Sequence, residues 1–286
     1  MLFVRVFGGL GNQIFQYVFY EYLRLNNENV FLDISDFEIH KHHYGFELNK
    51  VFGITPTYNE GIEKFKKVKQ SKLNRLISKL TKTQMVVKDE YVELQHYTIV
   101  RNTCIEKDVY FNGFWQNSEY IKAIGIEKVR KMLEFSLDLE DKNLEFKRMA
   151  DAENIVSVHI RRGDYLKNEE FGGICDKEYY TTAIKVAKEK VFNARFAFFS
   201  DDIAWCKENF KELENSIYVD WNSNEQSYKD MYLMTLCKGN IIANSTFSLW
   251  GAYLNNVEGA LVIAPERWTK HRKTEPLMLN EHWILL

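Results

Sequence analysis

The segment His159–Tyr165 (HIRRGDY) places two arginines, a glycine and an acid directly at the end of a short apolar run. This run, Ile155 to Ile160, is β-branched and precedes helical patterns, which predicts a buried strand of a parallel sheet. Ligands bind at the carboxyl ends of such strands, and a guanidinium fork fits two phosphate oxygens. We therefore predict a phosphate clamp at Arg161 and Arg162, with a tight backbone turn at Gly163. The alternative is a pair of surface arginines in a loop.

Two further polar segments follow predicted strands in the same half of the chain. The first contains Ser200, Asp201 and Asp202. An acid at that place can cap the next helix or accept hydrogen bonds from a base or a ribose, and the sequence leaves both readings open. The second segment, Ala243 to Ser248 (ANSTFS), opens a helix with several hydroxyls and free amides. It suits a phosphate and is equally suited to ordinary helix capping.

Asp230 lies in a predicted helix that is otherwise apolar. A carboxylate near the apolar face of a helix needs a partner, because burial without one is costly. An arginine is one candidate partner. A guanine base is another, because its N1–H and N2–H groups present two adjacent donors to a carboxylate.

The elements that must position these groups alternate regularly in the second half of the chain. Such alternation predicts a parallel, doubly wound sheet with right-handed crossovers. We place a domain boundary in the charged helical segment before the first of these strands, which gives domains 1–150 and 151–286. The predicted strands are 155–160, 195–199, 216–221, 240–243 and 260–264.

The N-terminus predicts a βα unit: a strand over residues 2–7, a glycine turn over 8–13 and a helix over 14–25. The N-terminus of that helix can face an anion. The turn lacks the third glycine of a dinucleotide fingerprint and the Gly-Lys-Ser/Thr of a P-loop. A plain tight turn therefore explains it equally well.

Composition excludes some classes of protein. The 286 residues carry a net charge of −2, which gives no general case for nucleic-acid binding. Residues 64–82 hold eight basic residues and no acidic one, so the rest of the chain carries −10. This segment predicts either a solvated helix or a basic amphipathic helix in peripheral contact with an anionic membrane. Without a signal peptide or a spanning run, we expect a cytoplasmic protein, with peripheral contact limited to the inner face of a bacterial membrane.

Two segments of the first half have ambiguous roles. Residues 110–120 (YFNGFWQNSEY) mix aromatic and polar side chains, and they suit either the core or a wall that faces a sugar. His40, His42 and His43 lie close together, but no carboxylate or cysteine completes a recognisable metal site. We interpret them as an exposed loop that faces an acceptor, and we predict no metal.

Taken in order, these segments resemble the bacterial α-1,2-fucosyltransferases of glycosyltransferase family 11, and the resemblance spans nearly the whole chain. It implies an α/β, two-domain GT-B-like fold with Rossmann-like parallel sheets. It also implies an inverting enzyme that moves L-fucose from GDP-β-L-fucose to the 2-hydroxyl of a β-galactoside in a surface-glycan precursor, without metal or cofactor. The segments that carry it are 8–16 (GGLGNQIFQ), 113–120, 159–165, 175–180, 199–202, 230–234 and 243–254.

The resemblance also implies roles for single residues. Arg161 would hold the β-phosphate with Arg162 behind it, and His159 and Asp230 would meet the guanine. The C-terminal domain would bind the donor, and the first domain would lie mainly on the acceptor side. Further donor contacts would come from Asn12, Ser200, Asp201, Ser245, Thr246 and Ser248. The group that takes the acceptor proton stays open among Asp36, His40, Glu119 and Asp164, with Trp115 as a further acceptor-side candidate.

Two other functions fit the same residues. One is a GT-B transferase with a different nucleotide-sugar donor, because its phosphate and guanine contacts would look alike. The other is a non-catalytic protein that senses a nucleotide sugar. Adhesion through Arg162-Gly163-Asp164 is a weaker reading, because it would require export.

Overall fold

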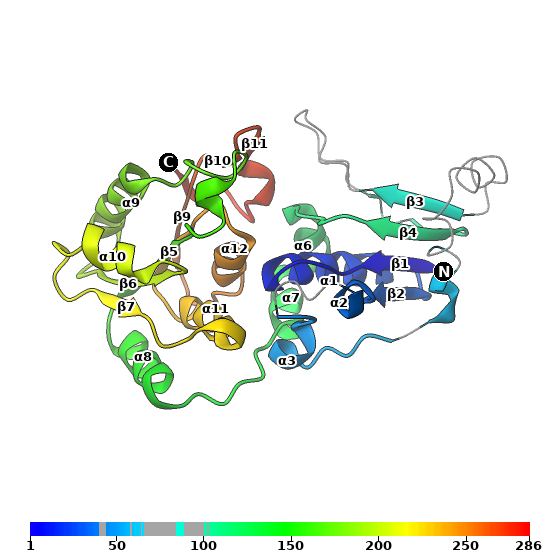
Figure 1. Ribbon diagram of the computed structural model, residues 1–286, viewed down its shortest axis with the longest axis horizontal. Helices are drawn as coiled ribbons and strands as arrows, with labels where there is room; N and C mark the ends of the chain where they lie inside the picture. Colours follow the sequence, from blue (N-terminus) through cyan, green and yellow to red (C-terminus); the bar gives the residue numbers. More distant parts are fainter. Residues whose placement is uncertain (40–43, 58, 64, 66–83, 89–99, 102) are drawn as a thin grey trace. The chain divides into compact units, whose positions relative to one another are not determined.

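The computed structural model describes the chain except residues 40–43, 58, 64, 66–83, 89–99 and 102 (Figure 1). It divides into two compact units, Met1–Glu134 and Phe135–Leu286. The predicted boundary after residue 150 is therefore about one helix too late. Helix α8 (Asp141–Ala152) belongs to the second unit, because its Phe146 packs edge-on against Phe199, with ring centroids 5.9 Å apart.

The first unit contains a four-stranded parallel sheet in the order β2-β1-β4-β3. Its strands are β1 (Leu2–Arg5), β2 (Val30–Asp33), β3 (Gln84–Lys88) and β4 (Asp108–Asn112). Helix α1 (Leu10–Arg24) begins earlier than predicted, directly after Gly9, and its Phe19 packs on Phe111 of β4. The remaining elements are α2 (Asp36–Ile39), α3 (Leu48–Phe52), η1 (Glu60–Ile62), α6 (Ser118–Ile124) and α7 (Ile126–Met132).

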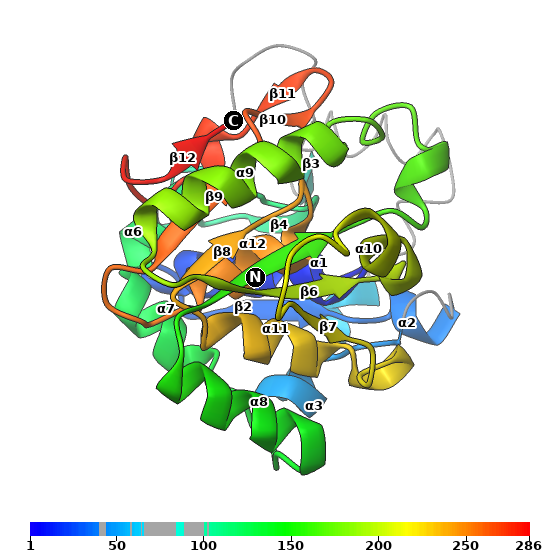
Figure 2. The ribbon, with the colours of Figure 1, turned by 90° about the vertical axis from the view of Figure 1, so that its left-hand side faces the viewer.

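The second unit contains a six-stranded parallel sheet in the order β12-β9-β8-β5-β6-β7 (Figure 2). From β5 the chain builds outward through β6 and β7, and then returns to the other side of β5 with β8 and β9. The order therefore reverses between β5 and β8, and ligands of open α/β sheets bind at such a switch point. The strands are β5 (Ile155–Ile160), β6 (Arg195–Ser200), β7 (Ile217–Val219), β8 (Gly239–Ile241), β9 (Leu261–Ala264) and β12 (Ile284–Leu285).

Helices cover both faces of this sheet (Figure 1). Helices α9 (Lys177–Lys190) and α10 (Ile203–Asn209) lie on one face, and α8, α11 (Tyr228–Thr235) and α12 (Thr246–Tyr253) lie on the other. The fold confirms the predicted α/β, GT-B-like class with Rossmann-like parallel sheets. Smaller elements are η2 (Tyr165–Lys167), η3 (Asn224–Gln226), η4 (Glu275–Leu277) and a hairpin of β10 (Arg267–Thr269) and β11 (Arg272–Lys273).

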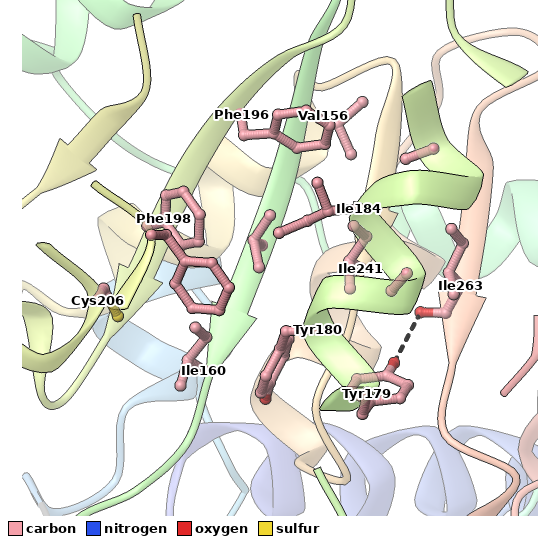
Figure 3. Close-up of a cluster of buried hydrophobic side chains, with 14 residues drawn as sticks. Val156, Ile160, Tyr179, Tyr180, Ile184, Phe196, Phe198, Cys206, Ile241 and Ile263 are labelled. Carbon is pink, nitrogen blue, oxygen red and sulfur yellow. Dashed lines mark hydrogen bonds between the residues drawn. The ribbon is translucent and has the colours of Figure 1, made fainter. Parts of the chain in front are cut away.

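The alternation of side chains along β5 decides what each face of the strand can do. Val156, Val158 and Ile160 point into the hydrophobic cluster under α9 (Figure 3). His159 therefore points to the opposite face, where its ring lies 5.6 Å from that of Phe247 on α12. The strand is buried along its whole length, so one strand both anchors the core and presents an imidazole to the other layer.

Within the described ranges, no helix is long and apolar enough to cross a membrane. The basic segment 64–82, apart from Phe65, lies outside the described residues, and so do His40, His42 and His43. The proposed membrane contact of this segment and the proposed role of His40 stay predictions.

Candidate functional site

Arg161 directly follows the last residue of β5, and two carboxylates hold its side chain in place. Its Nε and Nη2 atoms lie 2.9 and 2.8 Å from Oδ1 of Asp164, and its Nη1 lies 3.3 Å from Oδ2 of Asp201. About a third of the Arg161 side chain is exposed. These contacts fix the plane of the guanidinium and leave N–H groups on Nη1 and Nη2 for an anion. Asp164, predicted among the catalytic groups, is therefore a partner of Arg161 in this structure.

Arg162 has different side-chain partners and supports the loop. Its Nε donates to Oδ2 of Asp202 at 3.0 Å, and its guanidinium stacks on the ring of Trp205, 4.1 Å from the centroid. Its backbone N–H donates to Oδ1 of Asp201 at 2.9 Å. The two adjacent arginines thus have different environments, and Arg161 is the better placed to meet an anion.

The backbone turns at Gly163, as predicted, and the space around this residue is also tight. A Cβ at this position would lie 2.8 Å from Oδ2 of Asp201, which is closer than real Cβ contacts allow. The residue does not have a positive φ, so backbone strain is not the cause. Glycine here lets the Asp201 carboxylate pack against the loop while it binds Arg161.

The structure separates the two acids that follow β6. Oδ1 of Asp202 accepts the N–H of Trp205 at 3.2 Å, so Asp202 caps α10, one of the two predicted roles. The Ser200 hydroxyl accepts the N–H of Asp202 at 2.9 Å and stabilises the turn. Asp201 binds both arginines of the β5 loop, as described above.

His159 is buried, with 5% of its surface exposed. Burial and the nearby charge of Arg161 lower its pKa to about 3, so the imidazole is neutral at physiological pH. Among the described residues, its Nδ1 atom has no hydrogen-bond partner. A buried polar atom without a partner is costly, and this one lies beside Arg161 and the first turn of α12. It is the clearest sign of a ligand contact in this unit.

Helix α12 begins at Thr246 without a side-chain cap from Ser245. Thr246 is partly exposed, whereas Ser248 is fully buried and its hydroxyl donates to the carbonyl of Ser245 at 3.2 Å. Ser248 therefore has a structural role in this arrangement. Asn244, which sequence reasoning did not select, is buried and donates to the carbonyls of Phe171 and Trp268, at 3.1 Å each. It ties the loop after β8 to two distant segments.

Asp230 has an unusual environment for an acid. Its Oδ1 accepts a hydrogen bond of 2.8 Å from Nδ2 of Asn222. No other hydrogen bond to its side chain and no ion pair is present within the described part of the chain. Burial raises its pKa to about 8, and the bond from Asn222 opposes that rise. The carboxyl is thus poised between its two protonation states near neutral pH.

In the first unit, the glutamines of the GGLGNQIFQ segment hold loops together. The Gln13 amide is fully buried; it donates to the carbonyls of Gly8 and Gly45 and accepts the N–H of Glu47, all at 2.9 Å. Gln16, also fully buried, joins the loops after β1 and β4. Asn12 is partly exposed, and its Oδ1 accepts from Nε2 of Gln116 at 3.0 Å.

The acceptor-side candidates lie in three different environments. Asp36 is ion-paired with Arg5, whose Nε lies 2.8 Å from its Oδ2. Glu119 is half exposed and pairs with Lys122 at 2.9 Å on the surface of α6. Trp115 is 2% exposed and stacks on Phe19, with centroids 4.2 Å apart. The indole is therefore part of the core, one of the two places that the sequence left open for this segment, and helix α1 covers it. The acceptor-side role of Trp115 stays a prediction.

Glu47 is a titratable group that sequence reasoning missed. It is 6% exposed, and its carboxylate accepts the N–H of Leu10 in the first turn of α1. Burial raises its pKa to about 7. The burial of Glu47 could not be predicted, because the sequence around this residue shows no clear periodicity. Only the fold shows what surrounds its carboxyl group.

Within the described ranges, no group of three or more His, Cys, Asp or Glu side chains could hold a metal ion. The predicted metal independence stays a prediction.

Comparison with known proteins finds that the similar proteins described below are all glycosyltransferases. The sequence model described as Glycosyl transferase family 11 matches residues 1–286. An alpha-1,2-colitosyltransferase of Escherichia coli is 36% identical, and the match covers 98% of this chain and 97% of that protein. The E. coli O-antigen biosynthesis glycosyltransferase WbnK is 30% identical over 98% of each chain. Galactoside alpha-(1,2)-fucosyltransferase 2 of Bos taurus is 35% identical over 35% of this chain and 30% of its own length.

Proposed function

The chain belongs to glycosyl transferase family 11, and we propose that it transfers L-fucose from GDP-β-L-fucose to the 2-hydroxyl of a β-galactoside in a surface-glycan precursor. The transfer would invert the anomeric centre and would need no metal. The observation that carries the proposal is the unpartnered Nδ1 of His159 beside Arg161 and the first turn of α12. These groups meet at the switch point of a parallel sheet, where a nucleotide is expected.

The geometry suits the departure of a nucleoside diphosphate. Glycosyl transfer passes through an oxocarbenium-like state, and the leaving diphosphate gains negative charge as the glycosidic bond breaks. Arg161 would stabilise that charge, because Asp164 and Asp201 already hold its guanidinium in place. Thr246 and the backbone amides that begin α12 would add hydrogen bonds to the phosphates. Fixed groups of this kind need no reorganisation during the reaction.

His159, as a neutral imidazole, and Asp230, as a carboxylate, would contact the base. With Nδ1 or Nε2 protonated, the imidazole can either donate or accept a hydrogen bond. Asp230 would accept from N1–H and N2–H of guanine, for which it must be ionised. Because its pKa is about 8, binding of guanine would release a proton.

The acceptor proton needs a destination in an inverting displacement. Asp36 and Asp164 are ion-paired with arginines, and Glu119 is exposed. Glu47, with a pKa of about 7 and a place against the first turn of α1, joins them as a candidate. A strongly oxocarbenium-like transition state would reduce the need for any base.

A second candidate function has a specific observation behind it. The chain is 36% identical to an alpha-1,2-colitosyltransferase along nearly its whole length. Colitose is fucose without its 3-hydroxyl, so both sugars could be carried by the same nucleotide and attached through the same linkage. The contact that distinguishes them would involve only the 3-position of the sugar.

The test is a transfer assay with purified protein in the presence of EDTA. The donors are GDP-fucose and GDP-colitose, each offered with a panel of β-galactosides, and the readouts are GDP release and product linkage. Faster transfer of fucose to the galactose 2-hydroxyl supports the main proposal. Faster transfer of colitose supports the second candidate, and loss of transfer with EDTA contradicts metal independence. Tight binding of GDP-fucose without any turnover would indicate a sensor.

A further inference from the structure

The surroundings of Asp230 include two asparagines whose side chains bond to each other. Nδ2 of Asn143 donates to Oδ1 of Asn222 at 2.9 Å, and Nδ2 of Asn222 donates to Oδ1 of Asn143 at 2.8 Å. The second hydrogen on Nδ2 of Asn222 is directed at Oδ1 of Asp230, 2.8 Å away. Both asparagines are buried, with 6% and 9% of their surface exposed.

The partners of this pair fix the orientation of each amide. Oδ1 of Asn143 also accepts from Nε1 of Trp221 at 2.9 Å, so the oxygen of that amide must face Trp221 and Asn222. With Asn143 fixed, rotation of the Asn222 amide by 180° would bring oxygen against oxygen at both Asn143 and Asp230. Asn222 therefore presents an N–H, and never an oxygen, to Asp230.

A fixed donor at one oxygen restricts rotation of a carboxyl and so sets its plane, which leaves the other oxygen to accept a further hydrogen bond. Oδ2 of Asp230 has no hydrogen bond within the described part of the chain. Recognition of guanine requires a carboxylate in the plane of the base, because N1–H and N2–H lie side by side on one edge. Adenine presents an acceptor at N1, and hypoxanthine lacks the N2 amino group.

We propose that Asn143 and Asn222 form a positioning relay that sets the plane of the Asp230 carboxylate and thereby determines the preference for guanine over other purines. This inference rests on the proposed use of a GDP-linked donor. The relay gives α8 a part in donor selection, because hydrogen bonds link Asn143 of this helix to Asp230 through Asn222. A site built to bond a particular N–H discriminates strongly against analogues that lack it.

The test measures binding of GDP, IDP and ADP to the full-length protein by calorimetry. For the wild type we expect GDP to bind at least about tenfold more tightly than IDP, and ADP to bind more weakly still. Asn222→Ala should reduce the ratio of GDP to IDP affinity to about threefold or less, because Asp230 can then rotate. Asn143→Ala should reduce the ratio partly, because the Asn222 side chain stays in place but loses the partner that fixes its orientation. This variant also tests the relay if Asn222→Ala does not fold.

The matched control is Asn255→Ala, which removes a buried asparagine of the same unit. Asn255 bonds to the carbonyl of Cys237 and to Asn240, at 2.8 Å each. This variant should lower the Tm and keep the wild-type ratio of GDP to IDP affinity, which separates loss of stability from loss of selectivity.

If folded Asn143→Ala or Asn222→Ala protein keeps the wild-type ratio, the relay does not exist. If the wild type itself shows no preference for GDP, the guanine-linked donor is wrong, and the proposed function fails before the relay is tested.

Discussion

The two parallel sheets carry different chemistry at their carboxyl edges. In the second unit, the loops after β5 and β6 hold two arginines and three carboxylates in direct contact. In the first unit, the neutral amides of Gln16 and Gln116 join the loop after β4 to the β1–α1 segment. The Gln13 amide joins the loop after β1 to Gly45 and Glu47. In each unit one of these loops follows a strand at which the order reverses, β5 beside β8 in the second unit and β1 beside β4 in the first.

The difference shows that a shared architecture provides a place for a site and leaves its chemistry to the side chains. Charged groups that hold each other in place form a rigid surface that suits an anion. Buried amides satisfy backbone groups of loops that would otherwise be unpaired. We infer that the first edge is built mainly for shape and the second mainly for charge. The following changes test that division, from the largest expected effect to the smallest.

Replacing Arg161 should have the largest effect. Arg161→Ala should lower kcat by about 100- to 1000-fold, as loss of a preorganised donor does. Arg161→Lys should also be strongly impaired, since an ammonium keeps the charge but loses the planar fork. Initial rates of GDP release measure the effect, with Arg130→Ala on α7 as the control. Full transfer activity in the Arg161→Ala variant would contradict the proposed mechanism.

Replacing Gln16 should act on stability and leave nucleotide binding intact. Gln16→Leu leaves the Phe7 N–H and the Gly113 carbonyl without their partner, which should lower the free energy of unfolding by about 2–5 kcal/mol. Urea unfolding measures this loss, and Gln226→Leu at an exposed position is the control. At low urea, the GDP affinity of the folded variant should stay within about twofold of wild type. A large loss of GDP affinity would show that the first edge also supports the nucleotide.

The ionisation of Asp230 should make GDP affinity depend on pH. Its pKa of about 8 means that the carboxyl is mostly protonated at pH 7 and mostly ionised at pH 9. If guanine binds the ionised form, affinity should rise by about tenfold across that range. Binding is the readout, because Glu47 also titrates near neutrality and can affect turnover. Asp230→Asn should bind weakly with a flat profile; a wild-type affinity that does not rise with pH would exclude Asp230 as the guanine acceptor.

Replacing Glu119 should have the smallest effect. Its carboxylate is half exposed and pairs with Lys122 on the surface, and such pairs contribute little. Glu119→Gln should therefore change kcat/KM by less than about twofold. A loss of tenfold or more would restore Glu119 as a candidate for the proton acceptor.

The sequence predicted the fold of the second unit well because its signals are local. The strands of the second unit are short apolar runs, and the alternation with helices is regular, so the parallel sheet and the place of Arg161 at a strand end followed from pattern alone. Asp202 is in the same category, since a cap is a contact with residues three positions away. The first unit was harder, and strand β4 was not predicted because its aromatic and polar residues suit several structures.

The tertiary structure alone decided the contacts between residues that are distant in the sequence. The sequence predicted, from its motifs and its resemblance to glycosyltransferase family 11, that Arg161, His159 and Asp230 meet a nucleotide. Only the fold shows that Gly163 makes room for Asp201, that Trp115 is covered by α1, and that Asn143 of α8 reaches Asp230 through Asn222. The physical reason is that pattern encodes which face of an element is buried, whereas the partner across the interface depends on how elements from different parts of the chain pack together.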